Sequence, residues 1–352
     1  MSGGRLALLI QAAEVFAIYV HQLDPILFQF TESIALRWYG LAYLVGFIGG
    51  YFLLKRLAEQ NLWVLPAEKT GDFIAACALF GVFLGGRLGY ILFYHVREKG
   101  WASLASDPLL VFRVWEGGMA SHGGILGLVI FTFFYARKHR VSWTALGDGL
   151  CVVAPIGLMC GRLANFINGE LYGRVASGVA WAVKFPSAFG DMKAPEAGRF
   201  DSALLAAAEV DPRFAEVLDR ISGDPLVAGD HSAYFNALLA ANRESENVSA
   251  AIAPFLEPRH PSQLYEALLE GGLLFTILWM VRVKYPNAPH GMLTGLFFGL
   301  YATFRIVAEQ FREPDAAWVI EGTLTQGQFL SLFMYGFSAC FLIFAFRKRQ
   351  LA

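Results

Sequence analysis

The feature that most constrains the fold is a series of apolar blocks, each roughly twenty residues long, the length of helix that crosses a hydrocarbon core about 30 Å thick. Hydrophobic residues make up 56% of the 352-residue chain and charged residues only 16%. A typical soluble domain carries about a quarter charged residues. The sequence therefore predicts an all-α polytopic membrane protein.

Seven blocks qualify as membrane-spanning helices. They cover residues 38–56, 73–95, 119–136, 145–166, 263–281, 291–311 and 327–346. Glycine recurs within them, as in FLGGRLG and GGILG, which is typical of helices that approach closely in lipid. The pattern predicts about seven transmembrane helices with a long polar interval between the fourth and the fifth.

The polar interval, residues 167–261, is expected to form a small extramembrane α/β head. SALLAAAEV and PRFAEVLDR predict helices, and WAVKFP (181–186) predicts a short strand. The expected domains are an N-terminal extension (1–23), spans one to four (24–166), the head (167–261), and spans five to seven with a cytoplasmic tail (262–352).

Lysine and arginine in the short loops predict the orientation of the chain. They follow the first, third, fifth and seventh spans, and these alternate loops lie on one side of the membrane. That side is expected to be cytoplasmic, with the N-terminus and the head outside and the C-terminus inside. The loop after the second span also carries Arg97, Lys99 and Arg113, which weakens the contrast without reversing it.

Composition argues against several other classes of protein. The net charge is −1 and no basic stripe indicates nucleic-acid binding. The four cysteines lie inside apolar segments without a CxxC pair, so neither a zinc site nor a disulfide framework is indicated. Gln11 and Glu14 interrupt the first apolar run, which favours a loose or interfacial extension over a cleaved signal peptide.

Six ionisable side chains fall within the predicted spans or at their ends. They are Arg87, His122, Asp148, Arg162, Arg305 and Glu309. A charge at the bilayer centre costs about 2.5–3.5 kcal/mol on insertion scales, so such residues pair with one another or serve a function. The pattern by itself leaves both possibilities open.

Helical spacing favours a function for the arginines. Arg162, Asn165 and Asn168 recur every three residues and are expected on one side of a helix end. Arg305 has Glu309 and Arg312 at i+4 and i+7, on one face of span six. Guanidinium groups bind phosphate bidentately, so the pattern favours a phospholipid headgroup over a proton path.

Two further residues have a strong structural alternative. His122 lies among glycines in EGGMASHGGILG, where a lone histidine is usually a satisfied structural residue. Tyr39, in RWYG at the start of span one, has the position of an ordinary interfacial aromatic residue. RHPSQLYE (259–266) leads from the head into span five and supplies further polar groups at the membrane surface.

Taken together, the motifs resemble the prolipoprotein diacylglyceryl transferase family of bacteria. The residues that carry the resemblance are RWYGLAY, FLGGRLGY, VWEGGMASHGG, GRLANFINGELYGR (161–174), RHPSQLYE and FRIVAEQFREPD. They stand in the family's order over roughly residues 24–345. Ala164 replaces a glycine that is usual in the family, and the segment 175–258 is longer than the family core.

The resemblance implies transfer of the diacylglyceryl group of phosphatidylglycerol to the lipobox cysteine of a prolipoprotein signal peptide, in the bacterial plasma (inner) membrane. A thioether forms, glycerol phosphate leaves, and no metal or other cofactor is implied. Arg162 and Arg305 would bind the phosphate and His122 would act as a base. The remaining expected site residues are Tyr39, Asn165, Glu170, Gly173 and Glu309.

Two other functions remain as alternatives. A transporter or flippase for a lipid or another anion would also need several spans and buried arginines, although the sequence shows no repeated half. A membrane scaffold would explain the hydrophobicity but not six polar motifs on one side of the membrane. Covalent lipidation of a lipobox peptide would distinguish the transferase from both alternatives.

Overall fold

The structure is a computed structural model that describes residues 18–31, 35–113, 117–224, 230–314, 319–320 and 323–350. Contacts divide the chain into two units. A head unit comprises Met1–Ala42, Gly161–Ala267 and Ile306–Gln328, and a helical unit comprises Tyr43–Cys160, Leu268–Arg305 and Phe329–Ala352. Each unit combines distant parts of the sequence, whereas the expected domains were consecutive stretches. Most of the expected extension, residues 1–17, lies outside the described part.

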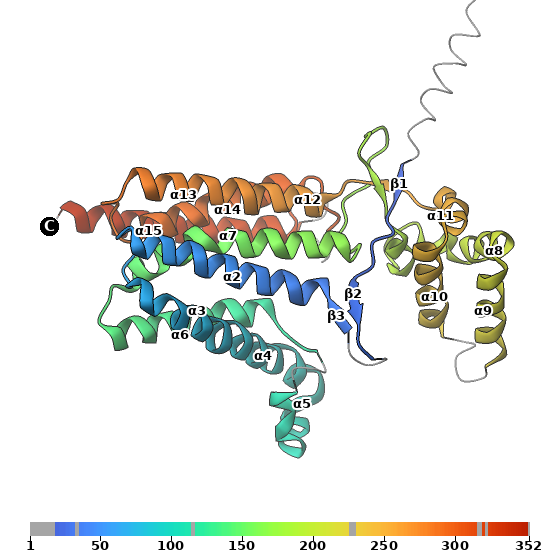
Figure 1. Cartoon of the computed structure of the whole chain (residues 1–352), viewed down its shortest axis with the longest axis horizontal. Coiled ribbons are helices and arrows are strands. Elements are labelled where there is room, and N and C mark those ends of the chain that lie inside the picture. The colour runs from blue at the N-terminus through green and yellow to red at the C-terminus, as the bar shows by residue number, and fades with distance from the viewer. Residues whose placement is uncertain are drawn as a thin grey trace, which may run out of the picture. The chain divides into compact units, whose positions relative to one another are not determined.

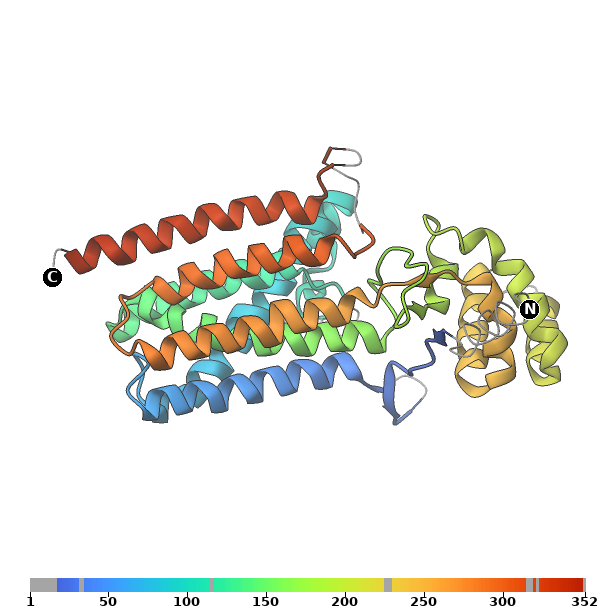
Figure 2. The ribbon, with the colours of Figure 1, turned by 90° about the horizontal axis from the view of Figure 1, so that it is seen from above.

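Long helices occupy the positions of the predicted spans (Figures 1 and 2). Single helices are α2 (Trp38–Glu59), α6 (Ser121–His139), α7 (Trp143–Ile167), α14 (Met292–Glu309) and α15 (Gln326–Gln350). The second span lies within Ala67–Ser106, where α3 (Thr70–Ala76), α4 (Leu84–Tyr90) and α5 (Val96–Ser106) are joined through π-helical turns. Helix α5 is kinked at Gly100. The fifth joins α12 (Ser262–Glu266), the π-helical η9 (Ala267–Leu273) and α13 (Leu274–Lys284).

Among the described residues, six of these helices are long and apolar enough to cross a membrane. The chain is thus an all-α polytopic membrane protein, as predicted. Helix α6 coincides with the predicted span 119–136 but is not one of the six. The count of seven therefore stays a prediction.

Glycine allows α4 and α6 to pack with their backbones almost in contact. A Cβ atom built on Gly85 would lie 2.7 Å from the carbonyl oxygen of Gly123, too close for any side chain. This close approach confirms the expectation drawn from FLGGRLG and GGILG. Elsewhere in the helical unit, Leu54, Val153 and Leu278 belong to a buried apolar core.

Asp148 is a structural residue of the helical unit. Its carboxylate accepts hydrogen bonds from Gly291 N (2.7 Å), Thr294 N (2.8 Å) and Thr294 Oγ1 (2.8 Å). These donors lie at the start of α14, whose first N–H groups have no partner within the helix. The buried carboxylate therefore stabilises the N-terminus of α14.

Short strands connect the start of the described chain to the head. Strand β1 (Tyr19–Val20) pairs in parallel with β4 (Val183–Lys184), which pairs antiparallel with β5 (Pro258–Arg259). Strand β4 lies within the predicted WAVKFP strand. Strands β2 (Ile26–Gln29) and β3 (Ala35–Arg37) form a separate antiparallel pair. Residues 19–20, assigned to the extension, are thus part of the head sheet.

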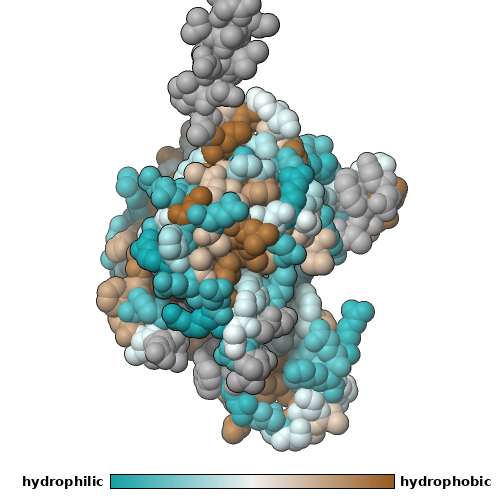
Figure 3. Space-filling view, turned by 90° about the vertical axis from the view of Figure 1, so that its right-hand side faces the viewer, coloured by the Kyte–Doolittle hydropathy of each residue, from teal (hydrophilic) through white to brown (hydrophobic). Residues whose placement is uncertain are grey.

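Four helices complete the head unit. They are α8 (Phe200–Val210), α9 (Pro212–Gly223), α10 (His231–Glu244) and α11 (Glu246–Ile252). The side chains of Asp211, Asp230 and Ser245 cap α9, α10 and α11 by accepting hydrogen bonds from backbone N–H groups. Phe189, Ala203 and Leu238 belong to the core between them. Hydrophilic residues alternate with smaller hydrophobic patches on the face shown in Figure 3.

Candidate active site

The chain turns immediately after α7, within GRLANFINGELYGR, and enters the signature loop, residues 168–174. Gly169 adopts φ +67° and Leu171 φ +56°, both in the left-handed region. Glycine adopts this conformation without the steric penalty that a side chain brings. The Glu170 backbone N–H donates to Asn165 O (3.1 Å) and closes the turn. Gly169 therefore permits this turn.

The turn brings three of the predicted site residues into direct contact. Asn165 Nδ2 donates to Glu170 Oε1 (2.8 Å) and to the hydroxyl of Tyr39. The Tyr39 hydroxyl in turn donates to Glu170 Oε1. Asn165 is buried, so its amide group is held by these partners. Tyr39 is therefore bonded to the signature loop, beyond what its place in the interfacial aromatic belt requires.

Gly173 lies between two other backbones. Its N–H donates to His260 O (2.9 Å), and a bridge pairs it with Arg312 on the other side. A Cβ atom at this position would lie 2.5 Å from the carbonyl oxygens of both His260 and Phe311. Gly173 is thus required by the close packing of these backbones.

Glu266, the last residue of α12, joins two arginines. Its Oε2 lies 3.0 Å from Arg162 Nη1, and its Oε1 lies 2.9 Å from Arg312 Nη1. The Glu266 side chain is fully buried, and Arg162 retains 18% exposure. The carboxylate fixes the direction of both guanidinium groups and offsets the cost of burying them.

Arg305 has a corresponding partner in the helical unit. Its Nη1 lies 3.5 Å from Oε1 of Glu270, a fully buried residue of η9. The π-helical turn is a rare conformation that occurs frequently at functional sites. Each arginine expected to bind phosphate therefore lies beside a buried carboxylate of the fifth span.

The sequence carried a signal for these carboxylates that we did not use. Gln263, Glu266 and Glu270 follow at i, i+3 and i+7 in an otherwise apolar helix, and all three are fully buried. That spacing places them along one side of a helix. Glu266 was noted only as a polar group at the surface, and Glu270 was missed.

The expected face of Arg305, Glu309 and Arg312 is only partly present. Helix α14 ends at Glu309, so Arg312 lies beyond it, in the bridge to Gly173. Glu309 is buried, and a Cβ atom built on Gly327 would lie 2.9 Å from its carboxylate. The prediction that Arg312 shares a helical face with Arg305 is therefore wrong, because the helix is shorter than span 291–311.

His122 lies in the first turn of α6 and is exposed. Arg87 holds the chain that leads into this helix. Its buried guanidinium donates to the backbone carbonyls of Val111 (3.2 Å), Gly117 and Gly118 (3.1 Å). Arg87 thus has a structural role. It holds the segment that precedes His122.

A second buried arginine connects the signature loop to the head. Arg259 pairs bidentately with Glu196, at 2.8 Å for both contacts, and its guanidinium lies 4.8 Å from the Tyr172 ring centroid. Burial raises the pKa of Tyr172, which donates to Asp191 Oδ2 (3.2 Å). Sequence analysis did not identify this cluster, because Arg259 and Glu196 are 63 positions apart.

The structure places the predicted site residues in two groups. Those in the head unit are Tyr39, Arg162, Asn165, Glu170, Gly173 and Glu309, and those in the helical unit are His122 and Arg305. Within the first group, Tyr39, Asn165 and Glu170 are in contact. Convergence of Arg162 and Arg305 on one phosphate stays a prediction.

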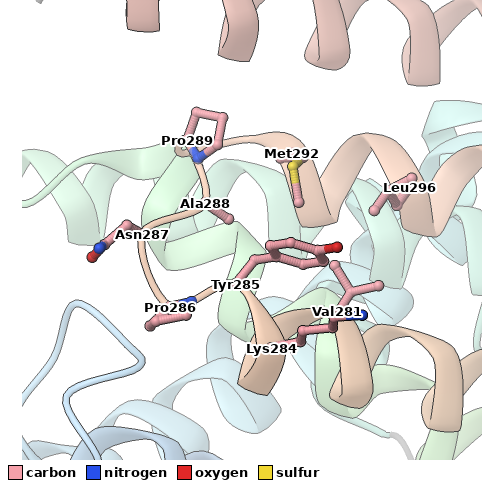
Figure 4. A pocket seen from close by; sticks show the side chains of 9 residues that line it. All are labelled: Val281, Lys284, Tyr285, Pro286, Asn287, Ala288, Pro289, Met292 and Leu296. Atoms are coloured by element: carbon pink, nitrogen blue, oxygen red, sulfur yellow. The ribbon is translucent and has the colours of Figure 1, made fainter.

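A cavity of about 540 Å³ lies at the turn between α13 and α14. Its lining includes Val281, Tyr285 and Met292, and Figure 4 shows the Tyr285 ring extending toward the other two. None of the predicted site residues lines it. The cavity therefore does not change the choice of candidate site.

Comparison with known proteins agrees with these motifs. The model of the prolipoprotein diacylglyceryl transferase family matches residues 25–344. Proteins named phosphatidylglycerol–prolipoprotein diacylglyceryl transferase are similar over most of the chain. The relative from Serratia proteamaculans is 36% identical over 93% of this chain and 94% of its own length.

Two further relatives carry the same name. The protein from Bdellovibrio bacteriovorus is 38% identical over 90% of this chain and 91% of its own length. The protein from Neisseria meningitidis (strain FAM18) is 37% identical over 88% and 92%, respectively. With six apolar helices among its described residues, the chain is a multi-pass bacterial membrane protein. It belongs to the prolipoprotein diacylglyceryl transferase family.

Proposed function

We propose that this chain transfers the diacylglyceryl group of phosphatidylglycerol to the thiol of the lipobox cysteine in a prolipoprotein signal peptide. The reaction forms a thioether, releases glycerol phosphate and is the first step of lipoprotein maturation. The observation that carries this proposal is the pair of contacts Arg162–Glu266 and Arg305–Glu270. A guanidinium group held by a buried carboxylate is already oriented before the phosphate arrives.

The mechanism follows from the charges that change during the reaction. A thiol with a pKa of about 8.5 is mostly protonated at neutral pH, so attack requires a base. His122 accepts the thiol proton, and the sulfur attacks the glyceryl carbon that bears the phosphate. The carbon–oxygen bond breaks and its electron pair passes to the phosphate oxygen. Arg162 and Arg305 stabilise the negative charge that grows on this group.

The other site residues hold the signature loop and the lipid headgroup. Tyr39, Asn165 and Glu170 form a hydrogen-bonded group that fixes the loop following Arg162. Gly173 allows the loop to lie against His260 and Phe311, and Glu309 contributes a buried carboxylate near the end of α14. The proposed reaction requires no metal or other cofactor.

We place the protein in the bacterial plasma membrane with its N-terminus outside and its C-terminus in the cytoplasm. The support is the distribution of lysine and arginine in alternate loops. In this orientation the head and the signature loop face the compartment into which prolipoproteins are exported.

The experiment is reconstitution of the purified protein in phosphatidylglycerol vesicles with a lipobox peptide. We expect a peptide product that carries one diacylglyceryl group in thioether linkage, detected by mass spectrometry. A peptide with serine in place of the lipobox cysteine is the control and should remain unmodified. Lipid scrambling without a covalent product would instead support the transporter or flippase.

A further inference from the structure

A small polar cavity of about 20 Å³ lies within the head unit, among residues that the proposed reaction does not use. Its walls come from the residues that follow β1, from the signature loop and from α10. His21, Asn168, Asn242 and Arg243 are its principal polar side chains, and Gly169 and Ser187 also line it. The cavity is thus a point where the signature loop meets the head.

Three of these side chains present a buried polar atom without a hydrogen-bond partner in the described part of the chain. The atoms are His21 Nε2, Asn168 Oδ1 and Asn242 Oδ1. His21 is 6% exposed and Asn242 is 2% exposed. Buried polar atoms in native proteins are nearly always bonded to protein groups or to ordered water.

The surrounding contacts prevent these groups from turning toward other partners. Asn242 Nδ2 donates to His21 O (3.0 Å), and Gln22 Nε2 donates to Asn242 O (2.9 Å). The His21 ring stacks on Phe185 at 5.4 Å and meets Phe166 edge-on at 5.5 Å. His21 and Asn242 are therefore held in place in the wall of the cavity.

The volume and the chemistry of the wall both select water as the ligand. A cavity needs about 10–15 Å³ to hold one water molecule. None of the lining residues is acidic, and Arg243 is among them, so a cation is disfavoured. The two amide oxygens disfavour an anion.

The hydrogen-bonding groups of the cavity wall also match those of one water molecule. Burial lowers the pKa of His21 to about 4, so at neutral pH its ring carries a single N–H. The backbone carbonyl of Phe166 is also an acceptor for the His21 ring. With the ring proton on Nε2, a water molecule accepts from Nε2 and donates to the two amide oxygens; with the proton on Nδ1, the water donates to Nε2 and to one amide oxygen.

We propose that one ordered water molecule, bound by His21 Nε2, Asn168 Oδ1 and Asn242 Oδ1, fixes the signature loop to the head. Asn168 follows the end of α7 and lies between Asn165 and Glu170 in the sequence. Ser187 Oγ donates to the carbonyl of the next residue, Gly169, and adds a second attachment. Asn168 is thus a positioning residue for the catalytic loop, an assignment that rests on the proposed transferase function.

The binding site is tested by an experimental structure of the full chain at a resolution that shows ordered water. We expect density in the cavity within hydrogen-bond distance of all three atoms. Absence of that density, in a map that shows other buried water molecules, would overturn the water site. This test is independent of any enzymatic activity.

The positioning role is tested by kinetics of Asn168→Leu and Asn242→Leu in phosphatidylglycerol vesicles. Because a displacement of about 1 Å costs up to roughly 100-fold in rate, we expect kcat to fall about 10- to 100-fold. The KM for lipid should change little. Asn168→Asp, which keeps an oxygen for the water, should retain more kcat than Asn168→Leu, and Asn236→Leu, on the exposed side of α10, should match the wild type.

A merely structural role predicts a different result. The variants would then melt at a lower temperature but show an unchanged kcat per folded molecule, and the positioning role would be rejected. If Asn168→Leu does not fold, the comparison of Asn242→Leu with Asn236→Leu decides, because only the first of these changes on α10 alters the wall of the cavity. A wild-type protein without transfer activity would reject the proposed function and leave the structural test of the water site intact.

Discussion

Arg162 and Glu266 form an ion pair of 3.0 Å that joins the last turns of α7 to the end of α12. The other oxygen of Glu266 contacts Arg312, so one buried carboxylate orients two arginines. Removing one partner of a buried ion pair typically costs about 3–5 kcal/mol, because the remaining charge has lost its counter-charge. The Glu266 side chain is therefore expected to matter for both stability and transfer.

We expect Glu266→Ala to lower the free energy of unfolding by about 3 kcal/mol or more and to reduce transfer sharply. Glu266→Gln, which keeps the size and one oxygen acceptor, should lose less of both. Thermal melting in detergent and peptide lipidation measure the two effects. Glu244→Gln, on an exposed part of α10, is the matched control. Wild-type activity in Glu266→Ala would contradict the orienting role.

The phosphate and base assignments are separated by substitutions at Arg162, Arg305 and His122. Arg162→Lys and Arg305→Lys keep the charge but lose the planar fork, so kcat should fall by about two orders of magnitude or more. His122→Gln should lower kcat by a similar amount while binding of phosphatidylglycerol is retained. If His122→Gln transfers lipid at a near-normal rate while Arg162→Ala is inactive, His122 is not the base. The assignment of Arg162 to the phosphate site would then stand.

Much of the fold could be predicted because hydrophobic blocks and helix boundaries are local properties of the chain. Helix α2 begins at Trp38, the first residue of the predicted first span, and β4 lies within WAVKFP. Contacts between distant segments could not be predicted in the same way. The pairing of Arg259 with Glu196, and of β1 with β4, depends on how the head folds back on itself.

The candidate site shows the same limit. Helical periodicity placed Arg162, Asn165 and Asn168 on one side of a helix end, yet their surroundings differ. Arg162 contacts Glu266, Asn165 contacts Tyr39, and Asn168 lines the small cavity. Helix α7 ends at Ile167, and the Asn168 N–H still donates to Ala164 O (2.9 Å), so Asn168 caps the helix. Residue type was therefore a better guide to the site than spacing near the helix end.

Gly173→Ala is expected to disrupt the junction between the signature loop and its two neighbouring backbones. The new methyl group would overlap the carbonyl oxygens of His260 and Phe311, and overpacking of this kind costs about 1–3 kcal/mol or more. We expect a lower melting temperature and loss of transfer. Gly198→Ala is the control in the same unit, since a Cβ atom there meets no atom within 4 Å. Equal behaviour of the two variants would reject the packing role.

Orientation can be measured by labelling single cysteines in a variant without the four native ones. That variant should transfer lipid normally, because the proposed nucleophile is the cysteine of the peptide. In this background, Met192→Cys in the head should react with a membrane-impermeant maleimide added outside the cell, since Met192 is 86% exposed. Asn287→Cys, in the exposed α13–α14 turn, should react only after the membrane is permeabilised. The opposite pattern would reverse the proposed topology, and an inactive but folded cysteine-free protein would indicate a covalent enzyme intermediate.

His21 should make the stability of the protein depend on pH in the acidic range. Burial lowers its pKa from 6.5 to about 4, and the nearby charge of Arg243 acts in the same direction. Between these two values the unfolded chain binds a proton at His21 that the folded protein does not bind. The free energy of unfolding should therefore fall as pH decreases from about 6.5 to about 4, by up to roughly 3 kcal/mol from this residue. Melting temperatures from pH 7.5 to pH 4.5 should decline less steeply in His21→Gln than in the wild type. His290→Gln, a change at an exposed histidine, should keep the wild-type slope, and identical slopes for His21→Gln and the wild type would show that His21 is protonated equally in both states.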